Sequence, residues 1–145
     1  MPTAITVVNL QKRIPLKIQP ILKAAQTILR HEGIRAGELS IVFVTDSRIK
    51  SLSKKYLQED HLTDVLPFGS DKFGISFKQQ VSGEIVISTD TAVKNARIYH
   101  ATPHREILLY VVHGILHLLG HDDQRDSDIR KMRRKEQSLM NLISK

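Results

Sequence analysis

Residues 113–123 read HGILHLLGHDD, and this stretch decides how the rest of the chain is interpreted. It ends an apolar segment that begins at Thr102 and Pro103, a capping hydroxyl followed by a proline, which is typical of the first turn of a helix. The segment runs to Leu119, and Gly120 stops it, because glycine adopts the left-handed conformation that ends helices. Apolar residues on nearly every side predict that this helix is buried.

Two histidines of this helix, His113 and His117, lie four positions apart. A helix places such residues on one face, about 6 Å apart at their β-carbons, where two imidazoles can bind one metal ion. A buried imidazole needs a partner, because an unsatisfied polar group is costly in a core. The alternative is that each ring is hydrogen-bonded inside the core. The glycine turn and the carboxylates that follow the pair favour a metal site.

The third ligand is expected beyond the glycine. His121 would lie about 12 Å along the axis from His113 if the helix continued, so the chain must turn back. Asp123 follows His113 by ten positions, the spacing at which H-E-x-x-H-x-x-G-x-x-H metalloproteases place their third ligand. We expect Asp123 to complete the site, with His121 as the alternative. Gly114 stands where those proteases carry their glutamate, so peptide hydrolysis by their route is not expected, although a metal can still activate water.

Glu106 precedes His113 by seven residues, about two helical turns, and so lies nearly on the same face. It is a candidate catalytic residue, either orienting an imidazole or serving as a base. The alternative is an ion pair with Arg105 or Arg97.

The remaining segments alternate between strand and helix patterns. The predicted strands are 5–10, 39–45, 63–68 and 84–88, and residues 71–80 are expected to form a hairpin or loop. The predicted helices are 16–32 before Gly33, 46 or 47 to about 57, 89 or 90 to about 100, 102–119, and 127 or 128 to about 143. Pro67 restricts the third strand to an edge or an end. This pattern predicts an α+β fold in one domain, 1–145: a small mixed β-sheet covered by helices, with a zincin-like His-x3-His helix.

Composition narrows the function. The chain has 145 residues, 41% of them hydrophobic, and no cysteine, so a metal must be held by histidine and carboxylates. No apolar stretch is long enough for a membrane span, and we expect a soluble, cytoplasmic protein. The 22 Lys and Arg exceed the 15 Asp and Glu by seven, which favours polyanionic partners. The last predicted helix carries a dense cationic cluster, interpreted as RNA-binding rather than only as a solvated face: Arg125, Arg130, Lys131, Arg133, Arg134 and Lys135.

At these motifs the chain resembles the YbeY family of bacterial ribonucleases. The family signature H-G-x-L-H-L-x-G-Y-D-H is similar to HGILHLLGHDD at 113–123, T-D-V-L-S-F is similar to TDVLPF at 63–68, and G-D/E-I-x-I-S is similar to GEIVIS at 83–88. The resemblance also includes Arg105-Glu106 and covers most of the chain. It implies an α+β fold, a zinc-like ion on three histidines, and single-strand-specific RNA cleavage in rRNA (16S) maturation and ribosome quality control.

Carried over by position, the resemblance places the first two ligands on His113 and His117 and the third on Asp123, an aspartate in place of histidine. His121 falls on the tyrosine of the family pattern, and an arginine that the family is thought to use for RNA falls on Leu57. The prediction is therefore a Zn²⁺-dependent endoribonuclease whose partner is ribosomal RNA of the small subunit. The rival predictions are a non-catalytic rRNA-binding assembly factor and a metal-dependent hydrolase of another substrate.

Overall fold

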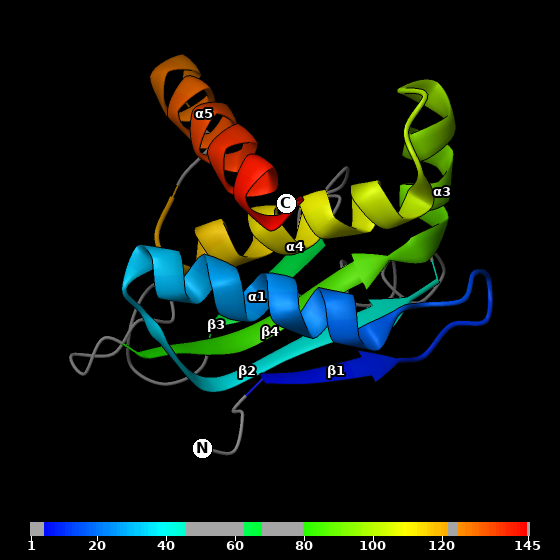
Figure 1. Cartoon of the computed structure of the whole chain (residues 1–145), viewed down its shortest axis with the longest axis horizontal. Helices are drawn as coiled ribbons and strands as arrows, with labels where there is room; N and C mark the ends of the chain where they lie inside the picture. The colour runs from blue at the N-terminus through cyan, green and yellow to red at the C-terminus, as the bar shows by residue number, and fades with distance from the viewer. Residues whose placement is uncertain (1–4, 46–62, 68–79, 122–124, 145) are drawn as a thin grey trace.

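The computed structural model describes residues 5–45, 63–67, 80–121 and 125–144. These residues form a four-stranded sheet and the helices α1, α3, α4 and α5 (Figure 1). The sheet and its helical cover confirm the α+β prediction. The predicted helix at 46–57 lies outside the described residues, as do residues 71–79 of the loop predicted at 71–80. Gln80 belongs to a strand instead, so the strand predicted at 84–88 begins four residues earlier, and the strand predicted at 39–45 likewise begins at Arg35.

The sheet has the strand order β1-β2-β4-β3. Its strands are β1 Ile5–Asn9, β2 Arg35–Val44, β3 Thr63–Pro67 and β4 Gln80–Ser88. β1 and β4 both pair with β2 in parallel, whereas β3 pairs antiparallel with β4. β3 is thus the last strand of the sheet and an edge strand. This position was predicted from Pro67, because proline cannot donate a ladder hydrogen bond.

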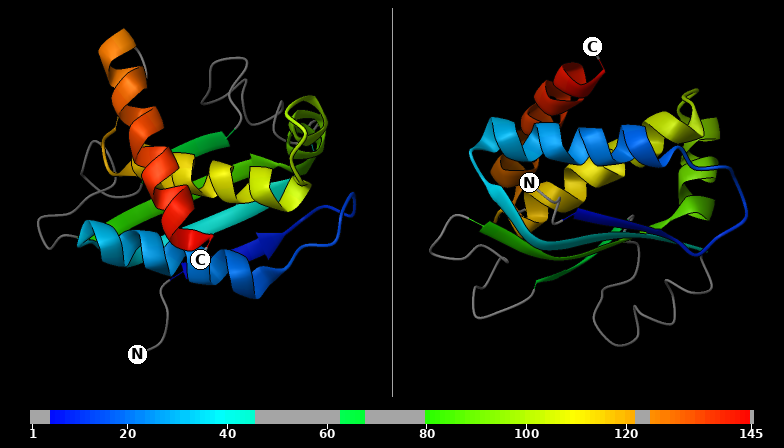
Figure 2. Two further views of the ribbon diagram at one scale, coloured as in Figure 1. Left: turned by 45° about the horizontal axis from the view of Figure 1, so that its top comes forward. Right: turned by 60° about the horizontal axis from the view of Figure 1, so that its bottom comes forward.

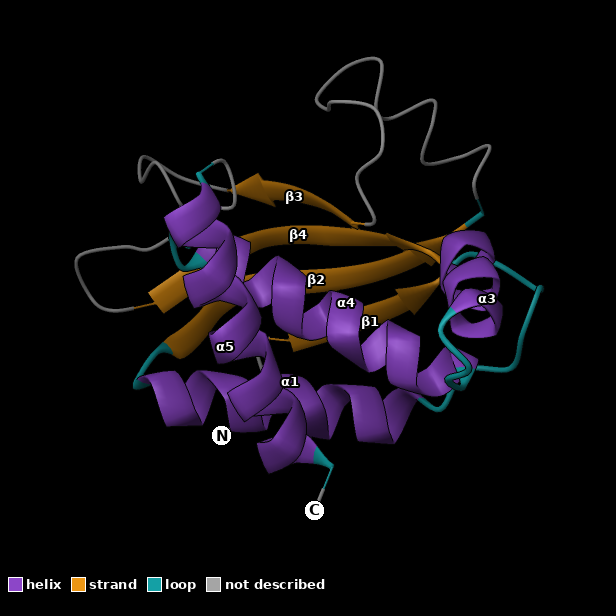
Figure 3. Cartoon of the chain, turned by 90° about the horizontal axis from the view of Figure 1, so that it is seen from above, coloured by secondary structure: helices purple, strands orange, loops and turns teal. Residues whose placement is uncertain are grey.

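All the described helices lie on one face of the sheet (Figure 2). They are α1 Ile18–Glu32, α3 Thr89–Ile98, α4 Pro103–Leu118 and α5 Asp126–Ile143. Figure 3 shows α1 and α4 lying along the sheet, α3 at one end, and α5 crossing above both. Because α5 crosses the C-terminal half of α4, it covers the part of the molecule where the two histidines lie.

The core lies between this face of the sheet and α4. Alternate residues of β2 and β4 point toward the helices, as the two-residue period of a strand requires. The core side chains at this layer are at most 1% exposed: Leu39, Ile41, Phe43, Ile85, Ile87, Ile107, Tyr110, Ile115 and Leu116. The apolar surroundings predicted for the His-x3-His helix are thus confirmed.

Two predicted helix boundaries hold and two need correction. Gly33 ends α1 at φ 71°, and the Thr102 hydroxyl accepts a hydrogen bond from the backbone N–H of Arg105 at the start of α4. The cap of α3 is Ser88, not Thr89 or Asp90, because the hydroxyl that accepts from the N–H of Thr91 belongs to the last strand residue. α5 begins at Asp126 without a side-chain cap, slightly earlier than predicted.

Within the described part of the chain, no helix combines the length and apolarity that a membrane span requires.

Candidate metal centre

His113 and His117 occupy successive turns of α4 and point their imidazoles at each other. Their Nε2 atoms are 2.9 Å apart, with ring centroids 4.5 Å apart and ring planes inclined by 74°. Two ligand atoms about 2.0–2.1 Å from a tetrahedral ion would be separated by about 3.3 Å. The two nitrogens therefore converge on one point at nearly the separation that a shared cation requires. The same distance is that of a hydrogen bond between the two rings, which is the alternative interpretation of the pair. The chemistry of the two donor atoms fits a metal ion, and the metal site stays a prediction.

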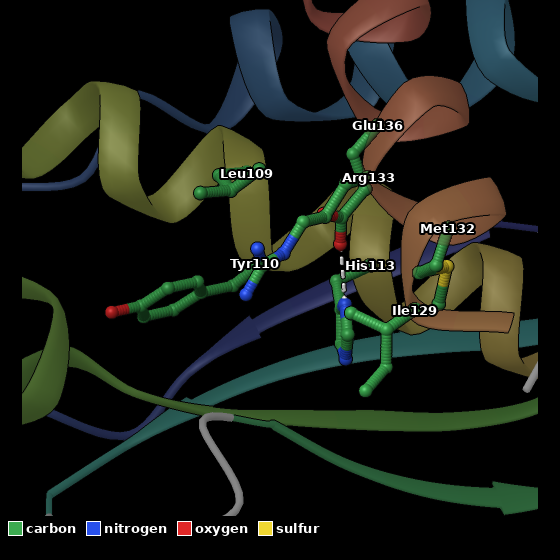
Figure 4. A pocket seen from close by; sticks show the side chains of 7 residues that line it. All are labelled: Leu109, Tyr110, His113, Ile129, Met132, Arg133 and Glu136. Carbon is green, nitrogen blue, oxygen red and sulfur yellow. Dashed lines mark hydrogen bonds and ion pairs between the residues drawn. The ribbon is translucent and has the colours of Figure 1, made fainter. Parts of the chain in front are cut away.

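The second nitrogen of His113 contacts a carboxylate from another helix. Nδ1 of His113 lies 2.5 Å from Oε2 of Glu136 on α5, and both side chains are largely buried, at 21% and 16% exposure (Figure 4). When Nδ1–H donates to this carboxylate, the lone pair of a neutral ring is on Nε2, the atom that faces His117. Carboxylates in this position fix the orientation of metal-binding histidines and raise their basicity.

Sequence reasoning missed Glu136. It identified the cations of this segment but not the acid among the apolar positions of the same helix. Glu136 lies four residues after Met132 and three before Leu139, both of which are buried. An acidic side chain on the apolar stripe of an amphipathic helix was the available signal, because such a charge requires a buried partner.

Gly114 brings α4 close to the sheet. A β-carbon added at this position would lie 2.6 Å from Cγ2 of Ile85 on β4, closer than non-bonded carbon atoms allow. The position that holds the general base in H-E-x-x-H proteases therefore faces the sheet here, with no space for a side chain. This contact supports the sequence argument against the usual protease chemistry.

Glu106 is buried in a different polar contact. The hydroxyl of Tyr110 accepts a 2.7 Å hydrogen bond from Nδ2 of Asn95, and the carboxylate of Glu106 lies near that hydroxyl. Burial raises the pKa of Tyr110. Glu106 is 6% exposed, and the carboxylate found on His113 is that of Glu136. The catalytic role expected of Glu106 stays a prediction.

His121 follows the glycine turn, where Gly120 has φ 98° and the N–H of His121 donates to the carbonyl of Leu116. Burial lowers the pKa of its imidazole, nearby Lys135 lowers it further, and Glu32 opposes both. Lys135 and Glu32 form a 2.8 Å ion pair between α5 and α1. The electrostatic neighbours of His121 therefore belong to the α1–α5 contact.

The third ligand of the predicted site is either His121, which is described, or Asp123. Within the described ranges, which include His121, no three histidine, cysteine or acidic side chains form a group able to hold a metal. Asp123 lies outside these ranges. The choice of Asp123 over His121 stays a prediction.

The cations of α5 separate into two sets. Arg133 lines a cavity of about 330 Å³ together with His113 and Glu136. Arg133 is exposed, as are four other cations proposed to contact RNA that do not line this cavity: Arg125, Arg130, Lys131 and Arg134. Lys135, the last cation of the cluster, forms the ion pair with Glu32. Leu57, the position of the family's arginine, lies outside the described residues.

Comparison with known proteins shows which family the sequence matches. The model of the family described as Endoribonuclease YbeY matches residues 6–144. A protein of Carboxydothermus hydrogenoformans named Endoribonuclease YbeY is 37% identical over 142 residues, covering 94% of this chain and 95% of that protein. One of the same name from Geobacter sulfurreducens is 34% identical over 147 residues, covering 99% of this chain and 96% of its own length.

A solved structure supports the fold. The solution structure of TM1509 from Thermotoga maritima superimposes with a TM-score of 0.62, at 24% sequence identity, over 96% of this chain and 88% of that one.

Proposed function

Because this chain belongs to the YbeY family of endoribonucleases, we propose that it cleaves single-stranded RNA during the maturation and quality control of ribosomal RNA. The observation that carries this proposal is the convergence of two imidazole nitrogens, 2.9 Å apart, beside a carboxylate that orients one of them. The substrate proposed is the rRNA of the small ribosomal subunit (16S), and the net charge of +7 supports a polyanionic partner.

His113, His117 and Asp123 are proposed to hold one Zn²⁺ ion. When bound, the ion supplies Lewis-acid activation of water and stabilises charge on the phosphoryl group. Glu136 keeps the Nδ1 proton of His113 in place, which leaves Nε2 as the donor atom to the ion. The apolar side chains around α4 exclude bulk water and so strengthen the electrostatic interactions inside the site.

Asp123 is favoured over His121 as the third ligand by two considerations. It matches the third-ligand position of the resemblance, and the electrostatic neighbours of His121 are Lys135 and Glu32. A carboxylate adds negative charge to the site, which makes the bound ion a weaker Lewis acid than three neutral histidines would. It also shifts the preference toward harder divalent ions.

Glu106 is proposed as a general base. Its position two turns before His113 on α4 supports this role. Replacement by glutamine is expected to lower kcat by at least about a hundredfold without loss of metal. An unchanged kcat would assign Glu106 to the buried contact with Tyr110 alone.

The proposal is tested by RNA cleavage. Wild-type protein with bound metal is expected to cleave a single-stranded oligoribonucleotide, and a chelator, His113→Ala or His117→Ala is expected to abolish cleavage. His104→Ala is the matched control, because it removes a histidine from the first turn of the same helix. Salt-sensitive RNA binding without cleavage would identify an assembly factor instead. Absence of RNA binding would favour a hydrolase of another substrate.

A further inference from the structure

Two adjoining cavities form a groove along the contact between α4 and α5. The first, of about 330 Å³, is lined by Leu109, Tyr110, His113, Ile129, Met132, Arg133 and Glu136. The second, of about 290 Å³, is lined by Arg105, Glu106, Leu109, Arg133, Glu136, Gln137 and Met140. Leu109, Arg133 and Glu136 line both cavities, so the α4–α5 groove extends from His113 to Arg105.

The groove offers two guanidinium groups to an anionic ligand. Its two carboxylates each face a protein group, because Glu136 contacts Nδ1 of His113 and Glu106 lies near the hydroxyl of Tyr110. The guanidinium groups of Arg105 and Arg133 have no ion pair or hydrogen bond with any described residue. Figure 4 shows Arg133 extending across the cavity toward Tyr110. Two cations are thus available to a ligand in the groove, and guanidinium groups suit phosphate oxygens.

The wall beside His113 is suited to a nucleobase. Leu109, Ile129 and Met132 give this cavity an apolar surface, and its volume is near the lower limit of about 300 Å³ for small-molecule sites. An unstacked base can pack against such a surface, whereas a paired base is not available to enter it. The cavity therefore has the size and lining for one nucleotide of a single strand.

We propose that the α4–α5 groove is a nucleotide subsite for the RNA strand on one side of the cleaved phosphate. One base packs against Leu109 and Met132, and Arg133 and Arg105 contact successive phosphates. His113 belongs both to the metal centre and to the groove wall, so a nucleotide in the groove is next to the reacting group. This inference rests on the proposed function and separates Arg133 from the cations of α5 that do not line the groove.

The test is the affinity of the metal-bound protein for a fluorescent, single-stranded 2′-O-methyl oligonucleotide, measured by anisotropy at several salt concentrations. Arg133→Gln and Arg105→Gln are each expected to raise Kd by about tenfold and to lower the salt slope by about one. Arg30→Gln is the control with the same change of charge and is expected to change Kd less than threefold, because Arg30 is an exposed residue of α1 that lines neither cavity. Leu109→Phe fills the cavity and is expected to raise Kd without changing the salt slope.

Three results would overturn the subsite. The first is an equal effect of Arg133→Gln and Arg30→Gln on Kd. The second is a loss of affinity in Arg133→Gln that accompanies loss of the metal. The third is duplex RNA that competes as well as the single strand. In all three the wild type still binds RNA, and the cleavage assay with a single-stranded oligoribonucleotide decides the proposed function separately. A wild type that binds no RNA would instead refute the proposed function.

Discussion

Glu136 Oε2 on α5 lies 2.5 Å from Nδ1 of His113 on α4, so a residue 23 positions away sets which nitrogen of the ring faces His117. This contact connects the two helices at the metal centre. It gives α5 a role in positioning a ligand as well as in carrying positive charge.

Glu136→Gln is expected to weaken zinc binding by about 10- to 100-fold, because an amide is a weaker acceptor for the Nδ1 proton than a carboxylate. Competition with a chromophoric chelator measures this change, and nitrogen NMR of the imidazole reports the ring tautomer. Glu38→Gln, an exposed acid on β2, is the control with the same change of charge. Unchanged zinc affinity in Glu136→Gln would show that the contact does not position the ligand.

Overpacking against Ile85 is expected to lower the free energy of unfolding of Gly114→Ala by about 1–3 kcal/mol. The higher helix propensity of alanine offsets about 1 kcal/mol of this loss. The cost should decrease in an Ile85→Ala background, where the crowded methyl groups are absent. Chemical denaturation of the wild type, the two single variants and the double variant gives the coupling energy between positions 114 and 85. An equal cost in both backgrounds would place the strain elsewhere.

Glu32 should contribute to stability in a pH-dependent way. Burial raises the pKa of its carboxyl, but the contacts with Lys135 and His31 outweigh burial and leave the pKa below the ordinary value of 4.5. A carboxyl whose folded pKa is lowered stabilises the protein above its unfolded pKa, and this contribution is lost as pH falls through the folded value.

The difference in free energy of unfolding between wild type and Glu32→Gln is therefore expected to decrease as pH falls below about 4.5. Chelator-treated samples keep metal binding out of the comparison. A difference that grows on acidification would contradict a lowered pKa of Glu32 in the folded protein.

Much of this architecture could be predicted because local signals agree with the tertiary structure. Thr102, Pro103 and the apolar run to Leu118 specify α4, and Pro67 marks the edge strand. The histidine pair was predictable because its spacing matches the helical repeat. Glu136 was not, since its partner lies on another helix and no local spacing encodes that contact. The closeness of α4 to Ile85, which requires Gly114, likewise depends on tertiary packing.

The central claim is that His113 and His117 share one ion with a third group beyond Gly120. Elemental analysis of purified protein tests it most directly, with wild type compared against His113→Ala, His117→Ala, Asp123→Ala, His121→Ala and the control His104→Ala. The account predicts about one ion per chain in wild type, His121→Ala and His104→Ala, and substantially less in the other three variants. Metal retained at the wild-type level in both His113→Ala and His117→Ala would contradict the metal centre. Metal retained in Asp123→Ala but lost in His121→Ala would identify His121, instead of Asp123, as the third ligand.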